Sequence, residues 1–365
     1  MANTGFVYHE QFLQHDTGQA ALTLPPTDLI EPDQHVESPT RIRRTVTLLE
    51  RSGLLPQLHR LPCEAASLED ITVYHRQEYI QSVAEFARQG GGQVVPGTGM
   101  GASSYDIALL AVGSGWRAVQ AVLQDEVTNA YAMLRPPGHH ALTDRAMGFC
   151  LFNNIAIAAR LARQRCGLDR VAIVDWDVHH GNGTQAAFYD DPSVLFISLH
   201  QDNLFPIQSG LVHDTGEGEG AGYTVNIPLP AGTGDAGYQY AFERVVMPII
   251  EQYAPQLILV SAGQDPSKYD PLGRMCVSAA GFRSMATIIH DLADRLCGGR
   301  LVLFQEGGYS HIYIPFATLA IVEAVSGIAT GVSDPFRPAY DTLQDWQRQA
   351  VESVVSTQKQ FWKLP

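Results

Sequence analysis

The chain has few cysteines, and their spacing pairs none of them. Its 365 residues include only Cys63, Cys150, Cys166, Cys276 and Cys297. An odd number of widely spaced cysteines without a Cys-x-x-Cys pair indicates neither a disulfide framework nor a structural zinc site made of thiolates. We therefore expect reduced cysteines, most of them in the core of a cytoplasmic protein.

Positive charge and long apolar runs are also scarce. The 24 lysines and arginines stand against 38 aspartates and glutamates, which gives a formal net charge of -14. Nucleic acids and anionic membranes attract basic surfaces, so this balance argues against both as partners. No stretch reaches the roughly 18 uninterrupted apolar residues of a membrane span, and the first residues lack the basic and apolar segments of a secretory signal.

Strand-like and helical patterns alternate over most of the chain. Apolar residues recur at helical spacing in Pro39–Ser52, Ser104–Glu126, Asn154–Arg163, Tyr238–Tyr253, Gly281–Leu296 and Pro315–Ile328. The strand-like runs between them predict an α/β fold with a mainly parallel sheet and helices on both faces. We expect a single domain over residues 1–365, because the chain is 45% hydrophobic and shows neither a repeat nor a clear linker.

Two segments fall outside this alternation. The loop Thr17–Ser38 is rich in proline and aspartate, and loops of this length in a compact domain are often functional. The C-terminal segment 340–365 is polar with spaced apolar residues. We expect it to pack on its own domain, with packing on a neighbouring subunit as the alternative.

Five strand-like runs end in short clusters of polar side chains. These clusters are His139-His140 after Asn129–Leu134, Asp175 to Asn182 after Val171–Val174, Ser198 to His200 after Val194–Ile197, Asp265 after Leu257–Val260, and Tyr309 after Leu301–Phe304. The carboxyl ends of the strands of an open parallel sheet face one ligand crevice. The sequence therefore predicts that these side chains converge on one site.

The predicted site contains the ligands of a catalytic metal ion. Asp177 and His179 are two residues apart after an extended strand, so their side chains leave on the same face. Together with Asp265 they make a set of two carboxylates and one imidazole, which leaves positions on a zinc ion open for water and a substrate carbonyl. Zinc lowers the pKa of bound water from about 15.7 to about 7.

The same site offers groups that move protons and stabilise an oxyanion. His139 and His140 are adjacent imidazoles, and Asp175 and Asn182 are available to set their tautomers. Tyr309 follows two glycines and can present its hydroxyl to a tetrahedral oxyanion. Alone, a histidine pair is more often a surface or core feature, Gly-Gly-Tyr is usually a turn, and the Asp-x-Asp-x-His run is as often a structural cation site or a helix cap. Their joint placement at one sheet edge favours a metal-dependent hydrolase.

The motifs resemble those of a known family. The stretches that match are His35-Val-Glu-Ser-Pro-Thr-Arg41, Arg135-Pro-Pro-Gly-His-His-Ala141, Met147-Gly-Phe-Cys-Leu-Phe-Asn-Asn154, Val174-Asp-Trp-Asp-Val-His-His-Gly-Asn-Gly-Thr-Gln185, Ile197-Ser-Leu-His200, Asp270-Pro-Leu-Gly273 and Glu306-Gly-Gly-Tyr309. From Phe6 to Pro338 the chain resembles the zinc-dependent histone deacetylases, in particular the bacterial class II histone deacetylase-like amidohydrolases. The resemblance implies the arginase/deacetylase fold, a three-layer αβα arrangement around a mainly parallel sheet of about eight strands.

The resemblance also implies a role for each matching residue. Its zinc ligands are Asp177, His179 and Asp265, and its acid and base are His139, paired with Asp175, and His140, paired with Asn182. Tyr309 would donate a hydrogen bond to the transition state, and the Gly148 carbonyl would accept one from the substrate amide. Phe149 and Phe205 would form the walls of the tunnel and Leu272 its rim. Arg41 would lie near an internal channel. Potassium would bind at Asp175, Asp177, His179, Ser198 and Leu199, and again at Phe188, Asp191, Val194 and Tyr223.

These roles imply a zinc-dependent amidohydrolase that also binds potassium and forms a homo-oligomer, a dimer or a tetramer. Its substrate is expected to be an acylated amine, most simply an N-ε-acyl-lysine peptide. The alternatives within this chemistry are an acylpolyamine, with the acidic loop segment Asp28–Asp33 as a source of negative charge, and a small or xenobiotic amide. A catalytically inactive protein that binds acyl ligands is an alternative of another class, but such a protein is expected to lack one of the site residues. An arginase-type two-manganese enzyme needs more metal ligands than these motifs supply.

One position departs from the family pattern. The family commonly has Phe before the third zinc ligand, whereas this chain has Gln264 before Asp265. An amide there can redirect Asp265 or reshape the acyl pocket through its hydrogen bonds. We hypothesise that Gln264 shifts the preference of the enzyme to an acyl group other than plain acetyl, or to a small amide.

Overall fold

The computed structural model describes residues 3–336 and 342–365, and an eight-stranded sheet runs through its centre. The strand order is β2-β1-β5-β10-β9-β6-β7-β8, and every neighbouring pair is parallel. The strands are β1 (Thr4–Val7), β2 (His59–Arg60), β5 (Asn129–Ala132), β6 (Val171–Asp175), β7 (Val194–Gln201), β8 (Thr224–Leu229), β9 (Leu257–Ser261) and β10 (Leu301–Phe304). The predicted α/β class and strand number are therefore confirmed.

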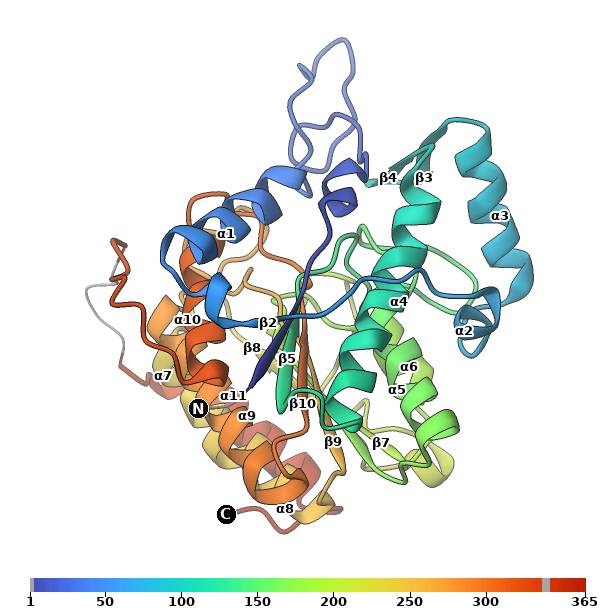
Figure 1. The fold of residues 1–365 in the computed structure, drawn as a ribbon. Coiled ribbons are helices and arrows are strands. Elements are labelled where there is room, and N and C mark those ends of the chain that lie inside the picture. Colours follow the sequence, from blue (N-terminus) through green and yellow to red (C-terminus); the bar gives the residue numbers. More distant parts are fainter. Residues whose placement is uncertain (1–2, 337–341) are drawn as a thin grey trace.

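Helices cover both faces of this sheet and complete the predicted three-layer arrangement (Figure 1). On one face lie α4 (Ser104–Leu123) and α5 (Asn154–Cys166), which contact each other and the central strands. On the other face lie α1 (Pro39–Arg51), α9 (Ala279–Cys297) and α10 (Ile314–Ser326), which form a connected layer. Because both faces are covered, the inner strands are continuous apolar runs, as in Leu257-Ile-Leu-Val260, rather than alternating ones.

Helix α4 is also the one described helix that is long and apolar enough, by length and composition, to cross a membrane. In this fold, however, 72% of the most apolar stretch of the helix is buried inside the protein. The helix contacts β1, β5, β10 and α5. A core helix passes the same test of composition, and these contacts account for the apolar character of α4.

The remaining elements are short or lie at the periphery. They are η1 (Glu10–Gln14), η2 (Leu55–Gln57), α2 (Leu68–Thr72), α3 (Gln77–Arg88), the antiparallel pair β3 (Gly91–Val95) and β4 (Thr98–Gly101), α6 (Asn182–Phe188) and η3 (Gly218–Gly220). The predicted helix Tyr238–Tyr253 is divided into α7 (Asp235–Ala241), a π-helical segment η4 (Phe242–Val246) and α8 (Met247–Tyr253). Apolar periodicity predicts the helical stretch but not the change in its hydrogen-bond pattern.

The described part of the C-terminal segment packs against β8 at the edge of the sheet. Helix α11 (Asp345–Gln358) contacts β8, α7 and η4. Beyond it, Trp362 Nε1 donates a hydrogen bond to the Gly222 carbonyl at 2.8 Å, and its ring lies 5.7 Å from that of Tyr223. This part of the segment therefore covers an edge strand of its own sheet. Such cover protects the unpaired backbone groups of an edge strand from pairing with another chain.

The long N-terminal loop projects from the body and is fixed at its base by buried charges (Figure 1). Glu37 accepts a hydrogen bond from Arg135 Nε at 2.9 Å and another from Arg41 at 3.0 Å, and all three side chains are fully buried. Arg135 also donates to the carbonyls of Phe12 and His15. Burial alone would raise the pKa of Glu37, but the charges of Arg135 and Arg41 lower it from 4.5 to about 2.

We predict that Glu37→Gln destabilises the protein by about 3–5 kcal/mol, because two buried guanidinium groups lose their counter-charge. The folded-state pKa lies below the unfolded one, so the contribution of Glu37 is complete above pH 4.5 and is lost as the pH falls towards about 2. Urea denaturation across this pH range measures the difference in the free energy of unfolding between the variant and the wild type. The exposed Glu85→Gln is the control, with an expected effect below about 1 kcal/mol. A difference for Glu37→Gln that stays constant over the range would contradict this assignment.

Candidate active site

Four strands of the sheet end in line, and the polar clusters begin at this line. Asp175 at the end of β6 pairs in register with Ser198 of β7 on one side and with Ser261 of β9 on the other. Phe304 at the end of β10 pairs with Ser261 and with Ala132 at the end of β5. The turns that follow these strands therefore bring the predicted site residues together at one edge.

Asp177, His179 and Asp265 form a compact buried cluster after β6 and β9. One ligand atom from each lies within 4.8 Å of the other two. His179 Nδ1 is 3.0 Å from Asp177 Oδ1 and 3.1 Å from Asp265 Oδ2. The outer oxygens are held by backbone amides, since Gly307 N donates to Asp177 Oδ2 at 2.8 Å and Val178 N donates to Asp265 Oδ1 at 2.8 Å.

This cluster fits a divalent metal ion. Asp265 Oδ2 is buried and has no hydrogen-bond partner among the described residues, which is costly for a carboxylate unless a cation compensates it. Space beside the carboxylates is kept open by glycine, because a Cβ on Gly307 would lie 2.1 Å from Asp265 Oδ2 and one on Gly263 would lie 2.2 Å from Asp177 Oδ2. Two carboxylates and one imidazole are a ligand set typical of catalytic zinc.

The adjacent histidines each meet the partner that the resemblance implied. His139 Nδ1 lies 3.0 Å from Asp175 Oδ2, and His140 Nδ1 lies 2.7 Å from Asn182 Oδ1. Glu306 adds a support that the sequence did not indicate, because its Oε2 accepts from the backbone amides of Gly138 at 2.7 Å and His139 at 3.2 Å. The turn that carries both imidazoles is therefore fixed from the end of β10.

The two imidazoles have opposite electrostatic environments. Burial lowers the pKa of His139, but the negative charges of Asp177 and Asp175 outweigh it and raise that pKa to about 10. Burial and the neighbouring rings of His139 and His179 lower the pKa of His140 well below its usual value. The aspartates thus favour a protonated His139, whereas burial and the neighbouring imidazoles favour a neutral His140.

The wall beside His140 depends on an unusual backbone. Gly148 has φ of +53° and Phe149 has φ of +69°, both in the left-handed region. A Cβ on Gly148 would lie 2.2 Å from His140 Cδ2, so only glycine allows the chain to approach the imidazole this closely. Phe149 N donates to Thr98 Oγ1 at 3.1 Å, which ties this turn to β4.

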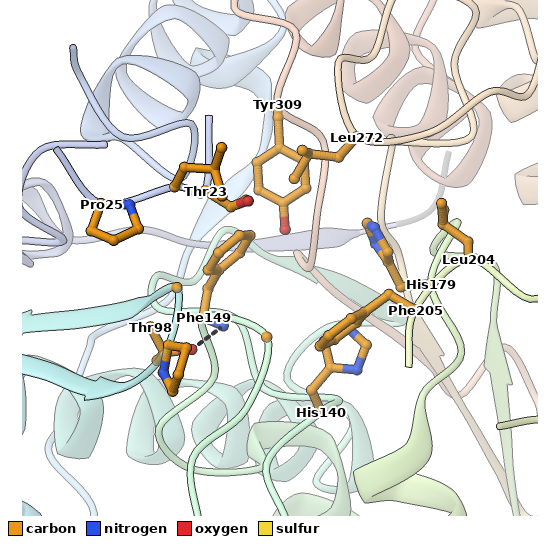
Figure 2. A pocket seen from close by; sticks show the side chains of 14 residues that line it. Thr23, Pro25, Thr98, His140, Phe149, His179, Leu204, Phe205, Leu272 and Tyr309 are labelled. Atoms are coloured by element: carbon orange, nitrogen blue, oxygen red, sulfur yellow. Dashed lines mark hydrogen bonds between the residues drawn. The ribbon is translucent and has the colours of Figure 1, made fainter. Parts of the chain in front are cut away.

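A cavity of 430 Å³ leads to these groups and is lined mainly by apolar side chains (Figure 2). Its walls include Phe149, Phe205 and Leu272, and the phenol of Tyr309 points into it toward the space between Phe149 and His179. The ring of Phe205 packs edge-on against His140 at 5.1 Å. Among the described residues that line the cavity, none is Asp, Glu, Lys or Arg.

Several lining residues were not predicted from the sequence. They are Thr23, Leu24, Pro25, Pro96, Gly97, Thr98 and Leu204. The loop Thr17–Ser38 was expected to be functional, and Thr23, Leu24 and Pro25 place it at the cavity. The acidic segment Asp28–Asp33 of that loop is exposed, and its residues do not line the cavity.

The residues implied for potassium lie beside β6 and β7. Ser198 and Leu199 belong to β7, and Ser198 pairs in register with Asp175. In the second set, the amide of Asp191 donates to the Phe188 carbonyl at 3.2 Å and the amide of Val194 donates to the Asp191 carbonyl at 3.4 Å. The Tyr223 carbonyl accepts from Phe196 at 2.8 Å, so it faces the neighbouring strand β7.

Arg41 does not line the described cavity but lies behind Tyr309. Its Nε donates to the Gly308 carbonyl at 2.8 Å, and its guanidinium carbon lies 5.2 Å from the centre of the Tyr309 ring. It therefore holds both the backbone before Tyr309 and the face of the phenol.

Gln264 is buried behind the carboxylate cluster and does not line the described cavity. Its Nε2 donates to the Tyr131 hydroxyl at 3.0 Å, and its Oε1 accepts from Gln305 Nε2 at 2.7 Å. Tyr131 donates to Gln305 Oε1 at 2.7 Å, which closes a ring of three side chains. Gln305 Nε2 also donates to the Gly307 carbonyl at 3.0 Å, so the ring reaches the glycine that lies beside Asp265 Oδ2. Gln264 can therefore influence Asp265 through Gly307. It cannot contact an acyl group in this cavity directly, because it does not line the cavity.

We predict that Gln264→Leu lowers the free energy of unfolding by about 2–4 kcal/mol, because buried donors and acceptors on Tyr131 and Gln305 lose their partner. Urea denaturation measures the change. The matched control is Gln239→Leu, at an exposed glutamine of α7, with an expected effect within about 0.5 kcal/mol. Equal stability of the two variants would show that the ring does not stabilise the protein.

Comparison with known proteins agrees with this geometry. A profile of the histone deacetylase domain matches residues 35–325. The histone deacetylase-like amidohydrolase of Pseudomonas aeruginosa is 43% identical over 362 residues, which cover 97% of this chain and 95% of the relative. The human polyamine deacetylase HDAC10 is 34% identical over 374 residues, which cover 99% of this chain and 53% of the relative.

A solved structure is similar over nearly the whole chain. The crystal structure of the HDA15 HD domain has a TM-score of 0.88 and 33% identity to this chain, covering 99% of it and 95% of that domain. The likeness thus extends to the backbone that carries the site and not only to the motifs. The chain belongs to the histone deacetylase family and is a hydrolase that acts on amide bonds.

Proposed function

We propose that the protein removes acyl groups from N-ε-acyl-lysine by zinc-dependent hydrolysis. The observation that carries this proposal is the convergence of three kinds of group at one apolar cavity, which His140, His179 and Tyr309 line. These are the cluster of Asp177, His179 and Asp265, the imidazole of His140 and the phenol of Tyr309. Together they supply the ligands, the proton acceptor and the oxyanion donor that amide hydrolysis requires.

Asp177, His179 and Asp265 would hold the zinc ion. Bound there, zinc supplies Lewis-acid chemistry that acidifies water and polarises a carbonyl. The remaining contributions come from the chain itself. Asp177 and Asp265 are oriented by the amides of Gly307 and Val178, so the ligand set is fixed before the metal binds.

The histidine pair would manage the protons. His140 lines the cavity and, held neutral by its surroundings, can accept a proton from the attacking water. His139 lies behind it, 4.0 Å between ring centres, and can return a proton to the leaving nitrogen. In the reaction a bond forms between the water oxygen and the acyl carbon, the carbon–nitrogen bond breaks, and amine and carboxylate leave.

Tyr309, Gly148 and the phenylalanines would position the substrate. The Tyr309 hydroxyl would donate to the oxygen of the acyl group as negative charge develops on it. The Gly148 carbonyl would accept from the amide nitrogen, and Phe149 and Phe205 would enclose the methylene chain of lysine. The enclosed chain of acyl-lysine is uncharged, which suits a cavity without charged lining residues.

An acylpolyamine is the second candidate substrate, because one relative is named a polyamine deacetylase. Such a substrate carries an ammonium group along its chain, and burying it without a counter-charge is costly. No acidic residue is found among the described lining residues, and the acidic loop residues are exposed. The lysine substrate is therefore favoured.

Potassium is part of the proposal as a structural ion. It would bind through oxygens of Asp175, Asp177, His179, Ser198 and Leu199, and at a second site through Phe188, Asp191, Val194 and Tyr223. The supporting observation is that these residues lie on or beside α6, β6 and β7. Oxygen-rich sets of this kind suit hard cations.

We predict that the zinc-loaded enzyme cleaves an acetyl-lysine peptide at least about tenfold more efficiently, by kcat/KM, than acetylputrescine, a difference of about 1.4 kcal/mol. A neutral acetanilide is the third substrate. Release of acetate from all three measures the ranking. Preference for acetylputrescine would overturn the lysine assignment and leave the hydrolase assignment intact.

We also predict that Tyr309→Phe lowers kcat on the acetyl-lysine peptide by about 10²–10³, since it removes one oxyanion donor. Its zinc content should equal that of the wild type, because the phenol is not in the ligand set. Unchanged kcat would remove Tyr309 from the mechanism.

A further inference from the structure

We infer that Asp270 is a positioning residue that fixes Tyr309 and the rim residue Leu272 in one arrangement. Asp270 is buried, and its Oδ2 accepts hydrogen bonds from the amides of Tyr309 at 2.6 Å and Ser310 at 3.2 Å. Its Oδ1 accepts from the amide of Leu272 at 2.9 Å. One carboxylate therefore joins the turn after β9 to the turn after β10. The inference rests on the proposed role of Tyr309.

The segment that carries Tyr309 needs such an anchor. It begins with Gly307 and Gly308, which have no side chains to pack, and Gly308 has φ of +114°, a conformation that glycine alone adopts readily. Before Tyr309, the backbone is held by the bonds of Gly307 to Asp177 and of Arg41 to the Gly308 carbonyl. At Tyr309 and after it, both amide donors are held by Asp270.

The contacts of the Tyr309 side chain do not replace this anchor. Its ring packs edge-on against Phe149 at 5.6 Å and lies under the Arg41 guanidinium. Such contacts tolerate sliding of the ring in its plane, whereas an oxyanion donor acts over a narrow range of distance. The backbone bonds to Asp270 therefore determine how far the hydroxyl extends into the cavity.

The same carboxylate determines the position of the rim. Leu272 lines the cavity and packs against the cluster of Val36, Phe149 and Tyr309. Its amide is held by the oxygen of Asp270 that does not bind Tyr309. The position of the Leu272 wall and the placement of the phenol are thus set by one residue that does not itself line the cavity.

Asp270→Asn tests the inference with almost no change of volume. An amide has one acceptor oxygen, so it satisfies either Leu272 or the pair Tyr309 and Ser310, and turns an NH₂ group toward the other. We expect kcat on an acetyl-lysine peptide to fall by about 10–10², as a misplacement of about 1 Å does elsewhere. The control is Asp169→Asn, an exposed aspartate at the opposite end of β6, for which no change is expected.

A trifluoroacetyl-lysine peptide separates positioning from general damage. Its electron-poor carbonyl depends less on an oxyanion donor, so both Tyr309→Phe and Asp270→Asn should reduce its cleavage less than that of the acetyl peptide. The double variant should cleave the acetyl peptide about as slowly as Tyr309→Phe alone, because Asp270 acts through Tyr309. Equal loss on both substrates, or multiplying losses in the double variant, would overturn the inference.

Asp270→Glu provides the test if the asparagine variant does not fold. It keeps both acceptor oxygens and moves them by one methylene, so the ratio of acetyl to trifluoroacetyl cleavage should fall in the same direction. An unchanged ratio would overturn the inference. If Tyr309→Phe leaves acetyl cleavage unchanged, the proposed function itself is contradicted. If Tyr309→Phe lowers acetyl cleavage but neither Asp270 variant changes the ratio of acetyl to trifluoroacetyl cleavage, only the role of Asp270 is contradicted.

Discussion

The in-register pairing of Asp175 with Ser198 on one side and Ser261 on the other aligns the carboxyl ends of β6 and β9 and places them level with Ser198 within β7. The pairing of Phe304 with Ser261 and with Ala132 extends the alignment through β10 to β5. Backbone hydrogen bonds of a parallel sheet thus decide where each following turn begins. Without this alignment the five polar clusters would lie at different heights, and neither the carboxylate cluster nor the histidine pair would face the same cavity.

This arrangement buries several acidic side chains close to one another, which is energetically unfavourable. Asp175, Asp177, Asp265, Asp270 and Glu306 are all buried near one another. Burial and neighbouring negative charge raise the pKa of Asp265 to about 7. Burial also raises the pKa of Glu306 to about 7, although His139 and the Gly138 amide act to lower it. Backbone amides and the imidazoles compensate part of these charges, and a cation in the cluster would compensate more. The family to which the chain belongs is zinc-dependent, and the cluster has the ligands for such an ion.

Local patterns predicted the strands, the order of elements and the residues at the strand ends, because each follows from a few adjacent side chains. The three-layer fold followed from the alternation of patterns and is confirmed. Apart from the convergence of the strand-end clusters and the two histidine pairs, long-range contacts were not predicted. Asp270 binds amides 39 and 40 residues away, Glu37 pairs with an arginine 98 residues away, and Thr23 and Thr98 meet the cavity from separate loops. No spacing rule connects residues so far apart, and the hydrogen-bond ring of Gln264 was likewise invisible in the sequence.

The most direct measurement of the central claim is anomalous X-ray diffraction at the zinc edge from crystals of the zinc-loaded protein. The account predicts one zinc ion, with oxygens of Asp177 and Asp265 and Nδ1 of His179 at about 2.0–2.2 Å. It also predicts that His139 and His140 remain outside the ligand set. Two metal ions in the cluster, or a zinc ion held by His139 or His140, would contradict it.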